Sequence, residues 1–225
     1  SYNTLNEALE AAQEMTEWNG SAVSRENPVE ISLLDNVVLD ETVTVEDIYS
    51  RPQTYHVKLN GEGHTVSRAE SFKNYMFHTA QSSTLIFENI IVDGALESGE
   101  ASDQAVLFIG SNGKFGMPQH HDTHDNYVVL GNGAVLQNNN NKNEGGAVKI
   151  GAGKFVLDGG TIKDNTSGKN GGGVSVGTGS QGPGEYTDHF YPSVFIMNSG
   201  TISGNKAVNN YSSGGGVSVE SDNTN

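Results

Sequence analysis

The densest group of side chains able to do chemistry lies in a stretch between residues 110 and 127. Imidazole nitrogens and carboxylate oxygens of the kind that bind Zn²⁺ and similar divalent ions cluster there. They are His120, His121, Asp122, His124 and Asp125. The ligands are nearly adjacent and lack the spacing of a zinc motif, so a solvated polar loop is the alternative. We predict no resident cofactor, with a divalent metal on this loop as a secondary hypothesis.

A second stretch, residues 177–194, mixes aromatic rings with polar groups. Such a mixture can stack on sugars or anchor a protein partner, and the alternative is that Phe190 and Tyr191 pack the loop onto the body of the protein. Together with a tyrosine at the end of the first stretch, these residues form the predicted ligand-binding set. It consists of Tyr186, Asp188, His189, Phe190, Tyr191 and Tyr127.

The remaining residues give little support for catalysis. Asp93, Asp158 and Asp164 are isolated carboxylates in turn-like sequence, whereas glycoside hydrolysis needs carboxylates that act as a pair. Cysteine is absent, and no Gly-x-Ser-x-Gly elbow lies between a strand and a helix. The sequence therefore favours a binding protein over an enzyme and predicts no catalytic residue.

The elements that must position these residues come from an internal repeat. Three stretches align without gaps: VVLGNGAVLQN at 128–138, FVLDGGTIKDN at 155–165 and FIMNSGTISGN at 195–205. Each is followed by a glycine tract and an alternating strand, GGAVKI or GGGVSV. One unit of three short strands forms a layer too thin to bury its own apolar face. Successive layers must therefore stack, with parallel pairing about 4.8 Å apart, as a parallel β-helix.

Within the repeat, Val156 is expected to point outward and Phe155, Leu157, Ile162, Val174 and Val176 inward. The alignment also places three asparagines at one position. Stacked amides there can hydrogen-bond from layer to layer as a ladder, and ligand binding is the less favoured reading. The predicted ladder is Asn138, Asn165 and Asn205.

The two chemically rich stretches are insertions in this repeat. Between Ile109 and Val128, and again between Val176 and Phe195, the chain is long, whereas the equivalent joint after Ile150 is only GAGK. We therefore expect the insertions at 110–127 and 177–194 to leave the same corner of the stack, on either side of the short joint, and to form one surface.

Domain organisation follows from the extent of the pattern. We predict a single domain over 1–225, with an amphipathic cap helix in 3–20 that starts at Thr4 or Asn3, and layers over 28–219. The sequence ends directly after a strand, so we expect a fragment of a longer chain.

Charge restricts the partners. The formal net charge is −15, with 27 acidic and 12 basic residues, which argues against nucleic acid and anionic membrane surfaces. No apolar run is long enough to span a bilayer, so we expect no membrane insertion. We expect a monomer.

With LNGEGHTVS, GGTIKDN, SGTISGN and the GGGVSV strands, the chain resembles the pectin-lyase-like superfamily, and especially the Asn- and Gly-rich repeats of bacterial surface adhesins. The resemblance implies an all-β, right-handed parallel β-helix (solenoid) with an N-terminal α-helical cap. It also implies a secreted or bacterial cell-surface protein that binds a host or matrix glycan or protein without catalysis.

The resemblance leaves two alternatives, a polysaccharide lyase or glycoside hydrolase of the β-helix class and a purely structural stalk. Lyases of the superfamily usually use an Arg as base, with Asp carboxylates holding Ca²⁺. The arginines here, Arg25, Arg51 and Arg68, all precede the clear repeats.

Overall fold

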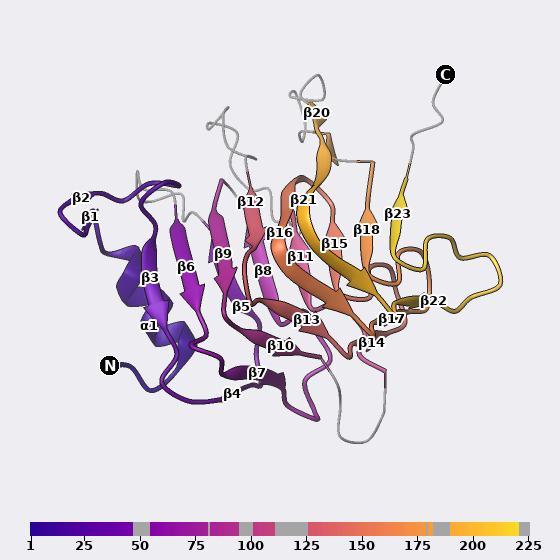
Figure 1. Cartoon of the computed structure of the whole chain (residues 1–225), viewed down its shortest axis with the longest axis horizontal. Coiled ribbons are helices and arrows are strands. Elements are labelled where there is room, and N and C mark those ends of the chain that lie inside the picture. Colours follow the sequence, from indigo (N-terminus) through magenta and orange to yellow (C-terminus); the bar gives the residue numbers. More distant parts are fainter. Residues whose placement is uncertain are drawn as a thin grey trace.

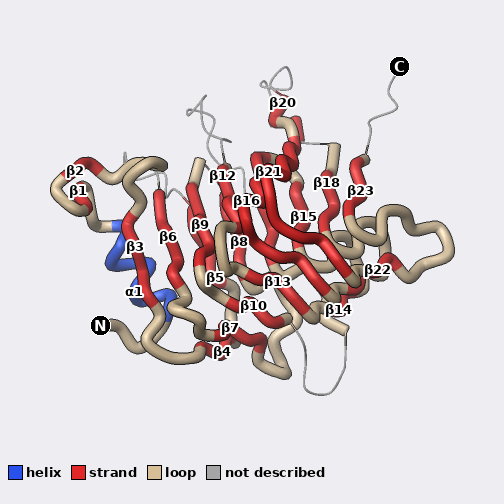
Figure 2. The backbone as a smooth tube through the Cα atoms, viewed as in Figure 1, coloured by secondary structure: helices blue, strands red, loops and turns tan. Residues whose placement is uncertain are grey.

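A computed structural model describes residues 1–46, 55–80, 82–94, 101–110, 126–178, 180–181 and 190–220. Within them the chain is mostly β, with one helix and parallel sheets that curl around a common apolar core (Figure 1). Figure 2 shows the helix at the N-terminal end and strands along the rest of the molecule. The predicted mostly-β architecture with an N-terminal helix is therefore confirmed.

Six layers follow one another along the chain, and the strands of the three main rows pair in parallel with their equivalents in the next layer. The first row of strands is β3 (Val29–Ser32), β6 (His56–Asn60), β9 (Thr84–Glu88) and β12 (Tyr127–Leu130). The second row is β4 (Val37–Leu39), β7 (Thr65–Arg68), β10 (Ile91–Asp93) and β13 (Val135–Gln137). Two long strands, β16 (Gly153–Lys163) and β21 (Ser193–Ser203), continue both rows and join them into one bent sheet.

The third row forms a separate six-stranded sheet. Its strands are β5 (Val43–Glu46), β8 (Phe77–Ala80), β11 (Leu107–Ile109), β15 (Val148–Ile150), β18 (Val174–Val176) and β23 (Val217–Val219). A small sheet at the corner between the second and third rows contains β14 (Asn140–Asn141), β17 (Thr166–Ser167) and β22 (Lys206–Ala207). The unit is thus the predicted succession of three strands, except that the first two fuse in the last two layers.

The core consists of one inward row of side chains from each strand. Phe155, Leu157, Ile162 and Val174 are fully buried and Val176 nearly so, as the alternation predicts, whereas Val156, which was expected to point outward, is only 4% exposed. Register carries the same positions through the stack, since Leu130 pairs with Leu157, and Val148 with Val174. Burial of apolar area between layers is therefore the main stabilising contribution.

The N-terminal helix is shorter than the predicted cap. Helix α1 spans Leu5–Gln13 and begins with a complete capping box, in which Thr4 accepts from the Glu7 amide and Glu7 accepts from the Thr4 amide. The predicted extension to residue 20 is wrong because β1 (Glu17–Trp18) and β2 (Ser21–Ala22) form a hairpin there. Asn19 and Gly20 both have positive φ, which an Asn-Gly hairpin turn requires.

Glycine tracts permit the close approach of layers at the corner before the third row. Gly145, Gly171 and Gly214 each have φ near +70°, and a Cβ there would clash with the carbonyl of the residue three positions on. The next glycine meets a different obstacle, because a Cβ on Gly146 would overlap the carbonyl oxygen of Gly172 in the following layer. Side chains at these positions would push the layers apart.

We expect Gly146→Ala to lower the free energy of unfolding by about 3 kcal/mol or more, since overpacking between two backbones cannot relax by a side-chain rotation. The control is Gly216→Ala in the last layer, where the new Cβ would lie 3.5 Å from Ile202 Cγ2 in ordinary contact. Urea unfolding of both variants measures the difference. Equal destabilisation would contradict the proposed role of the close interlayer approach.

The asparagine ladder exists, but one predicted member is wrong. Val135 pairs with Thr161 and Gln137 with Lys163, so Asn139, and not Asn138, is equivalent to Asn165 and Asn205. The backbone amide of Asn139 donates to Asn165 Oδ1 at 3.0 Å, and the backbone amide of Asn165 donates to Asn205 Oδ1 at 3.0 Å. The gapless alignment fails because the turn after Leu130 is one residue longer than the turn after Leu157.

Asn138 instead occupies the turn position before the ladder. Its φ of 58° matches 57° at Asp164 and 65° at Gly204, so this position requires left-handed backbone. Its side chain points outward and donates to Asp93 Oδ2 at 2.9 Å. Asn138 thus forms the left-handed turn, and the next residue, Asn139, forms the ladder hydrogen bond.

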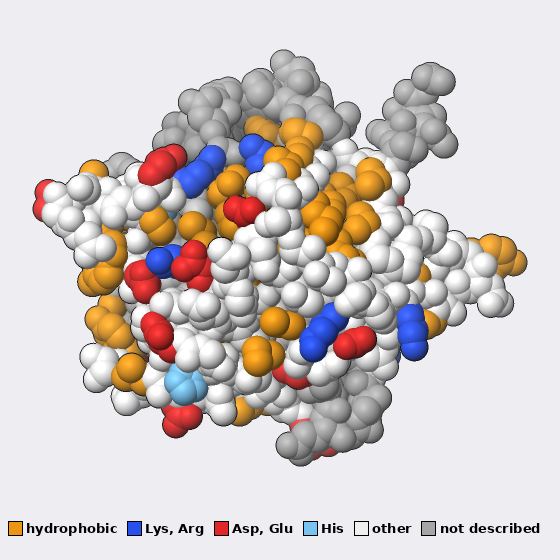
Figure 3. Space-filling view, viewed as in Figure 1, with side chains coloured by type: hydrophobic (Ala, Val, Ile, Leu, Met, Phe, Trp, Pro, Cys, Tyr) orange, Lys and Arg blue, Asp and Glu red, His pale blue; other side chains and the backbone are white. Residues whose placement is uncertain are grey.

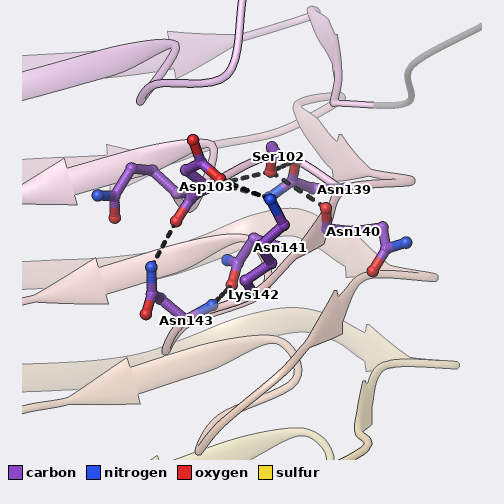
Figure 4. Close-up of polar contacts among 8 residues, drawn as sticks. Ser102, Asp103, Asn139, Asn140, Asn141, Lys142 and Asn143 are labelled. Carbon is purple, nitrogen blue, oxygen red and sulfur yellow. Dashed lines mark hydrogen bonds and ion pairs between the residues drawn. The ribbon is translucent and has the colours of Figure 1, made fainter. Parts of the chain in front are cut away.

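The ladder starts at a buried arginine. Arg68 is only 4% exposed, and its guanidinium donates to Asn139 Oδ1 and to the carbonyl oxygens of Phe72 and Asn74. Burial lowers the pKa of Arg68 to about 10, because no water solvates the cation well. Figure 4 shows Asn139 within a wider network, in which Ser102 also donates to Asn139 Oδ1 and Lys142 pairs with Asp103.

We expect Asn139→Ala to destabilise the protein by about 3 kcal/mol, because it removes one acceptor of the buried Arg68 cation and leaves the Gly146 carbonyl without its side-chain donor. Asn138→Gly should change stability by less than about 0.5 kcal/mol, because glycine tolerates the left-handed backbone. Thermal and urea unfolding of the pair tests the register, and the reverse order of effects would restore the gapless alignment.

Candidate functional site

The roots of the two insertions lie together, at the corner between the third and first rows. The Gly153 amide donates to the carbonyl of Pro192 at 3.0 Å, and the Lys154 amide donates to the carbonyl of Asn126 at 2.8 Å. Asn126 ends the first insertion and Pro192 ends the second, so the short joint lies between them. The expectation that both insertions leave one corner is confirmed for their roots. We call Gly110, Asn126, Tyr127, Lys154 and Pro192 the corner surface.

The insertions are narrower than the predicted ranges 110–127 and 177–194. Tyr127 already belongs to β12, and Ser193 and Val194 belong to β21. The second insertion also opens as a short antiparallel ladder, in which β19 (Ser180–Gln181) pairs with β20 (Phe190–Tyr191). This ladder holds the base of the loop in an extended conformation, which the sequence pattern did not predict.

Tyr127 is the aromatic centre of the corner surface. It lies on the outer face of the first row, in register with Thr84 and Lys154. The Arg25 guanidinium carbon lies 4.5 Å from the ring centroid, and the Lys154 ammonium nitrogen lies 5.8 Å from it. Two cations near one partly buried ring give the corner local positive charge in a protein with net charge −15.

His56 lies on the same outer row, two strands from Tyr127, with Thr84 between them. Burial, and then the nearby Arg25 cation, lower the pKa of His56 below its ordinary value, so the imidazole is neutral at pH 7. His56 Nδ1 lies 2.8 Å from the Thr84 hydroxyl, which resembles a nucleophile and its base. Thr84 is fully buried, however, and its hydroxyl cannot reach a substrate. The pair is therefore structural.

On the other side of the corner, a stack of rings anchors the start of the first insertion. His78 Nε2 lies 2.7 Å from the carbonyl of Gly110, where the insertion begins. The Phe108 ring stacks on His78 at 5.3 Å and on Tyr75 at 4.9 Å. Burial and the Glu144 carboxylate raise the pKa of Tyr75 to about 12, so the phenol stays neutral. The root of the insertion is thus held by buried side chains.

Most of the predicted site residues lie outside the described residues. They are the candidate metal ligands His120, His121, Asp122, His124 and Asp125, and Tyr186, Asp188 and His189 of the second insertion. For Phe190 the backbone alone is described, in β20, while Tyr191 is a partly buried residue of the same strand. Within the described part of the chain, no three His, Asp or Glu side chains are grouped as a metal site.

The isolated carboxylates serve turns in the described structure. Asp93 accepts from Gln137 at 2.8 Å and from Asn138, both in the next layer. Asp158 accepts from Ser199 at 3.3 Å, and Asp164 holds the left-handed turn position. These contacts explain the carboxylates as links between layers.

Neither described arginine is placed to act as the catalytic base of a lyase. Arg68 is buried in the ladder and Arg25 lies on Tyr127, whereas Arg51 is outside the described residues. Sequence reasoning missed Arg25 and Lys154 as neighbours of Tyr127, and His56 two strands away on the same row. The strand register would have placed His56 and Lys154 on the same outer row, but Arg25 comes from an irregular segment without a repeat.

Searches for relatives leave the chain without a family, because no family model, curated protein or solved structure matches it. Among the described residues, no helix is long and apolar enough to cross a membrane. The proposed function therefore rests on the geometry and charge of the corner surface.

The lowered pKa of His56 predicts a pH dependence of stability. Since the folded protein binds this proton less well than the unfolded chain, stability should be full above about pH 6.5 and fall as the pH drops below it. Melting curves between pH 7.5 and 5 should show a smaller decrease for His56→Gln than for the parent. Parallel decreases in both proteins would exclude His56 as a source of the effect.

Proposed function

We propose that the chain is a right-handed parallel β-helix of the pectin-lyase-like type, within a secreted or bacterial cell-surface protein, and that it acts by binding. The ligand is a host or matrix glycan, which the corner surface and its two insertions bind together. The observation that carries the proposal is the convergence of both insertions on Gly153 and Lys154, beside Tyr127. Loops on a rigid scaffold are the usual place for recognition.

The chemistry around Tyr127 supports a glycan. Sugars present hydroxyl and carboxylate oxygens together with apolar ring faces, and proteins bind them with aromatic rings and hydrogen-bond donors. Arg25 and Lys154 supply charged donors beside the ring. At physiological salt the distant acidic residues are largely screened, because the Debye length is about 8 Å. Local donors therefore decide which ligand binds.

The strand register defines how each insertion can be removed. Gly110, Gly151 and Gly177 are equivalent, as are Tyr127, Lys154 and Val194. Replacing residues 111–125 by one Ala, or residues 178–192 by one Ala, recreates the short joint in which Ala152 is the linking residue. Either shortened protein should fold, since the layers below the joint are unchanged.

We expect the parent to bind glycans on an array of neutral and acidic polysaccharides, and each shortened variant to lose at least about tenfold in affinity. Tyr127→Leu keeps apolar volume but removes the ring, and should weaken binding similarly. Val38→Thr is the control, because Val38 is 65% exposed on the second row of the first layer. Melting curves verify folding. Binding that is equal in all variants would place recognition away from the corner surface.

A protein ligand is the second candidate, and one observation favours it. Ile86, Val129 and Ile196 are partly exposed residues of one apolar row next to the row of Tyr127, whereas Val156 in the same row is only 4% exposed. Figure 3 shows hydrophobic groups gathered in the middle of this face, with Lys and Arg groups near its upper edge. A protein partner would bury this row, so Ile196→Lys would then weaken capture more than Tyr127→Leu.

A polysaccharide lyase or hydrolase and a structural stalk are the remaining alternatives. Turnover of pectate or neutral glycans, with or without Ca²⁺, that disappears on replacing Asp93 or Asp158 would establish an enzyme. Absence of both turnover and binding would favour the stalk.

A further inference from the structure

The last layer of the stack has an open face. Strands β21, β22 and β23 end their sheets, and each pairs with a single neighbour on the side of the preceding layer. At the opposite end, α1 covers the first layer with Leu5, Leu9 and Ala12, all buried. Figure 1 places these two ends of the stack at opposite ends of the molecule.

Apolar side chains that are buried in the preceding layer are uncovered here. Leu157 is fully buried, whereas its partner Met197 is 49% exposed. Val176 is 3% exposed, whereas its partner Val219 is 71% exposed. The same inward position therefore changes from core to surface between two consecutive layers.

The open face also lacks the charges that usually protect sheet edges. Residues 193–219 contain one charged residue, Lys206, in a chain with 27 acidic and 12 basic residues. Exposed edges normally carry Lys, Pro or inward-pointing charges that prevent pairing. Sparse charge and exposed inward side chains are the properties of a surface that another layer covers.

The asparagine ladder defines the direction of pairing. The backbone amide of each ladder asparagine donates to the side-chain Oδ1 of the asparagine in the next layer, from Asn139 to Asn165 and from Asn165 to Asn205. Within the described part of the chain, no residue accepts from the backbone amide of Asn205, whereas its side-chain amide donates to the carbonyl of Ile162. An asparagine Oδ1 from beyond the open face would continue the ladder by accepting from this amide, as Asn165 Oδ1 and Asn205 Oδ1 do in the preceding layers.

We infer that the open face binds one further parallel layer of the same repeat, with aliphatic side chains above Met197 and Ile202 and an asparagine above Asn205. This layer continues the interface that β16 already makes with β21, at the same positions. The inference is independent of the proposed glycan binding.

A second copy of the protein does not satisfy these requirements. A two-fold symmetric contact would pair two identical edge strands antiparallel, whereas the layers of the stack pair in parallel. A head-to-tail contact would present the first layer of the next copy, which lies under α1. The ladder therefore needs a layer whose first face is free.

The test is an extension of the chain by one layer. Val219 is equivalent to Val176 and Ile150, so a copy of residues 151–176 in place of residues 220–225 follows Val219 as the original follows Ile150. Two matched controls carry the same extension, one with Leu157→Asp and Ile162→Asp in the copy and one with Asn165→Ala in the copy.

Oxidation of Met197 by hydrogen peroxide reports on the open face, and Met15 at 37% exposure is an internal reference. We expect the intact extension to slow Met197 oxidation at least about fivefold, with Met15 unchanged, and to raise the melting temperature by about 5 °C. The Asp control should behave like the parent, and the Asn165→Ala control should protect Met197 less well than the intact copy.

Three results would overturn the inference. One is an unprotected Met197 in the intact extension, and another is equal protection by the Asp control. The third is protection of Met197 in the parent through a dimer, detected by light scattering, because a second copy would then be the occupant.

Discussion

Parallel register between layers about 4.8 Å apart is the constraint on which this structure depends. A layer of three short strands encloses a core only one side chain thick, so each inward residue must meet its equivalent above and below. Leu130, Leu157 and Met197 form one such column, and Val148, Val174 and Val217 form another. A change of register by one residue would turn the whole inward set outward. Every other feature must preserve that register.

Buried polar groups preserve it at the corner between the second and third rows. Turns stacked this closely bury backbone amides and carbonyls that water cannot reach. The stacked asparagines form hydrogen bonds with these groups from layer to layer. Asn165 is fully buried and donates to the carbonyls of Leu136 and Lys163 as well as serving the ladder. Arg68 ends the column by donating to Asn139 Oδ1, and Gly94 leaves room for Asn139, because a Cβ on Gly94 would lie 2.6 Å from Asn139 Cβ. A cation with several carbonyl partners thus replaces an amide where the repeat is less regular.

The sequence predicted what depends on repetition and missed what depends on local turn length. Alternation identified the buried residues of β16 and β18, because a period of two has one inward solution. Asn138 was misassigned because one additional turn residue after Leu130 shifts the alignment without changing the residue types. The cap helix was overextended because its apolar stripe continues toward Trp18, while the Asn19-Gly20 turn ends it. At the corner, Arg25 approaches Tyr127 from a non-repeating segment, and only coordinates reveal such a contact.

The joint between the third and first rows contains the two long insertions, whereas the asparagine corner varies in length by only a few residues between the layers that contain the ladder asparagines. The ladder positions at that corner are filled by amides and by glycines that allow no side chain, so additional residues at these positions would break hydrogen bonds between layers. At the other joint, Ala152 is linked to its neighbours by backbone bonds at Gly151 and Gly153 that an insertion can leave in place. His78 and Phe108 fix one end of the first insertion, and Asn126 fixes the other. The loop sequence can therefore vary without changing the register of the stack. A repeat scaffold needs this independence if its loops are to bind ligands.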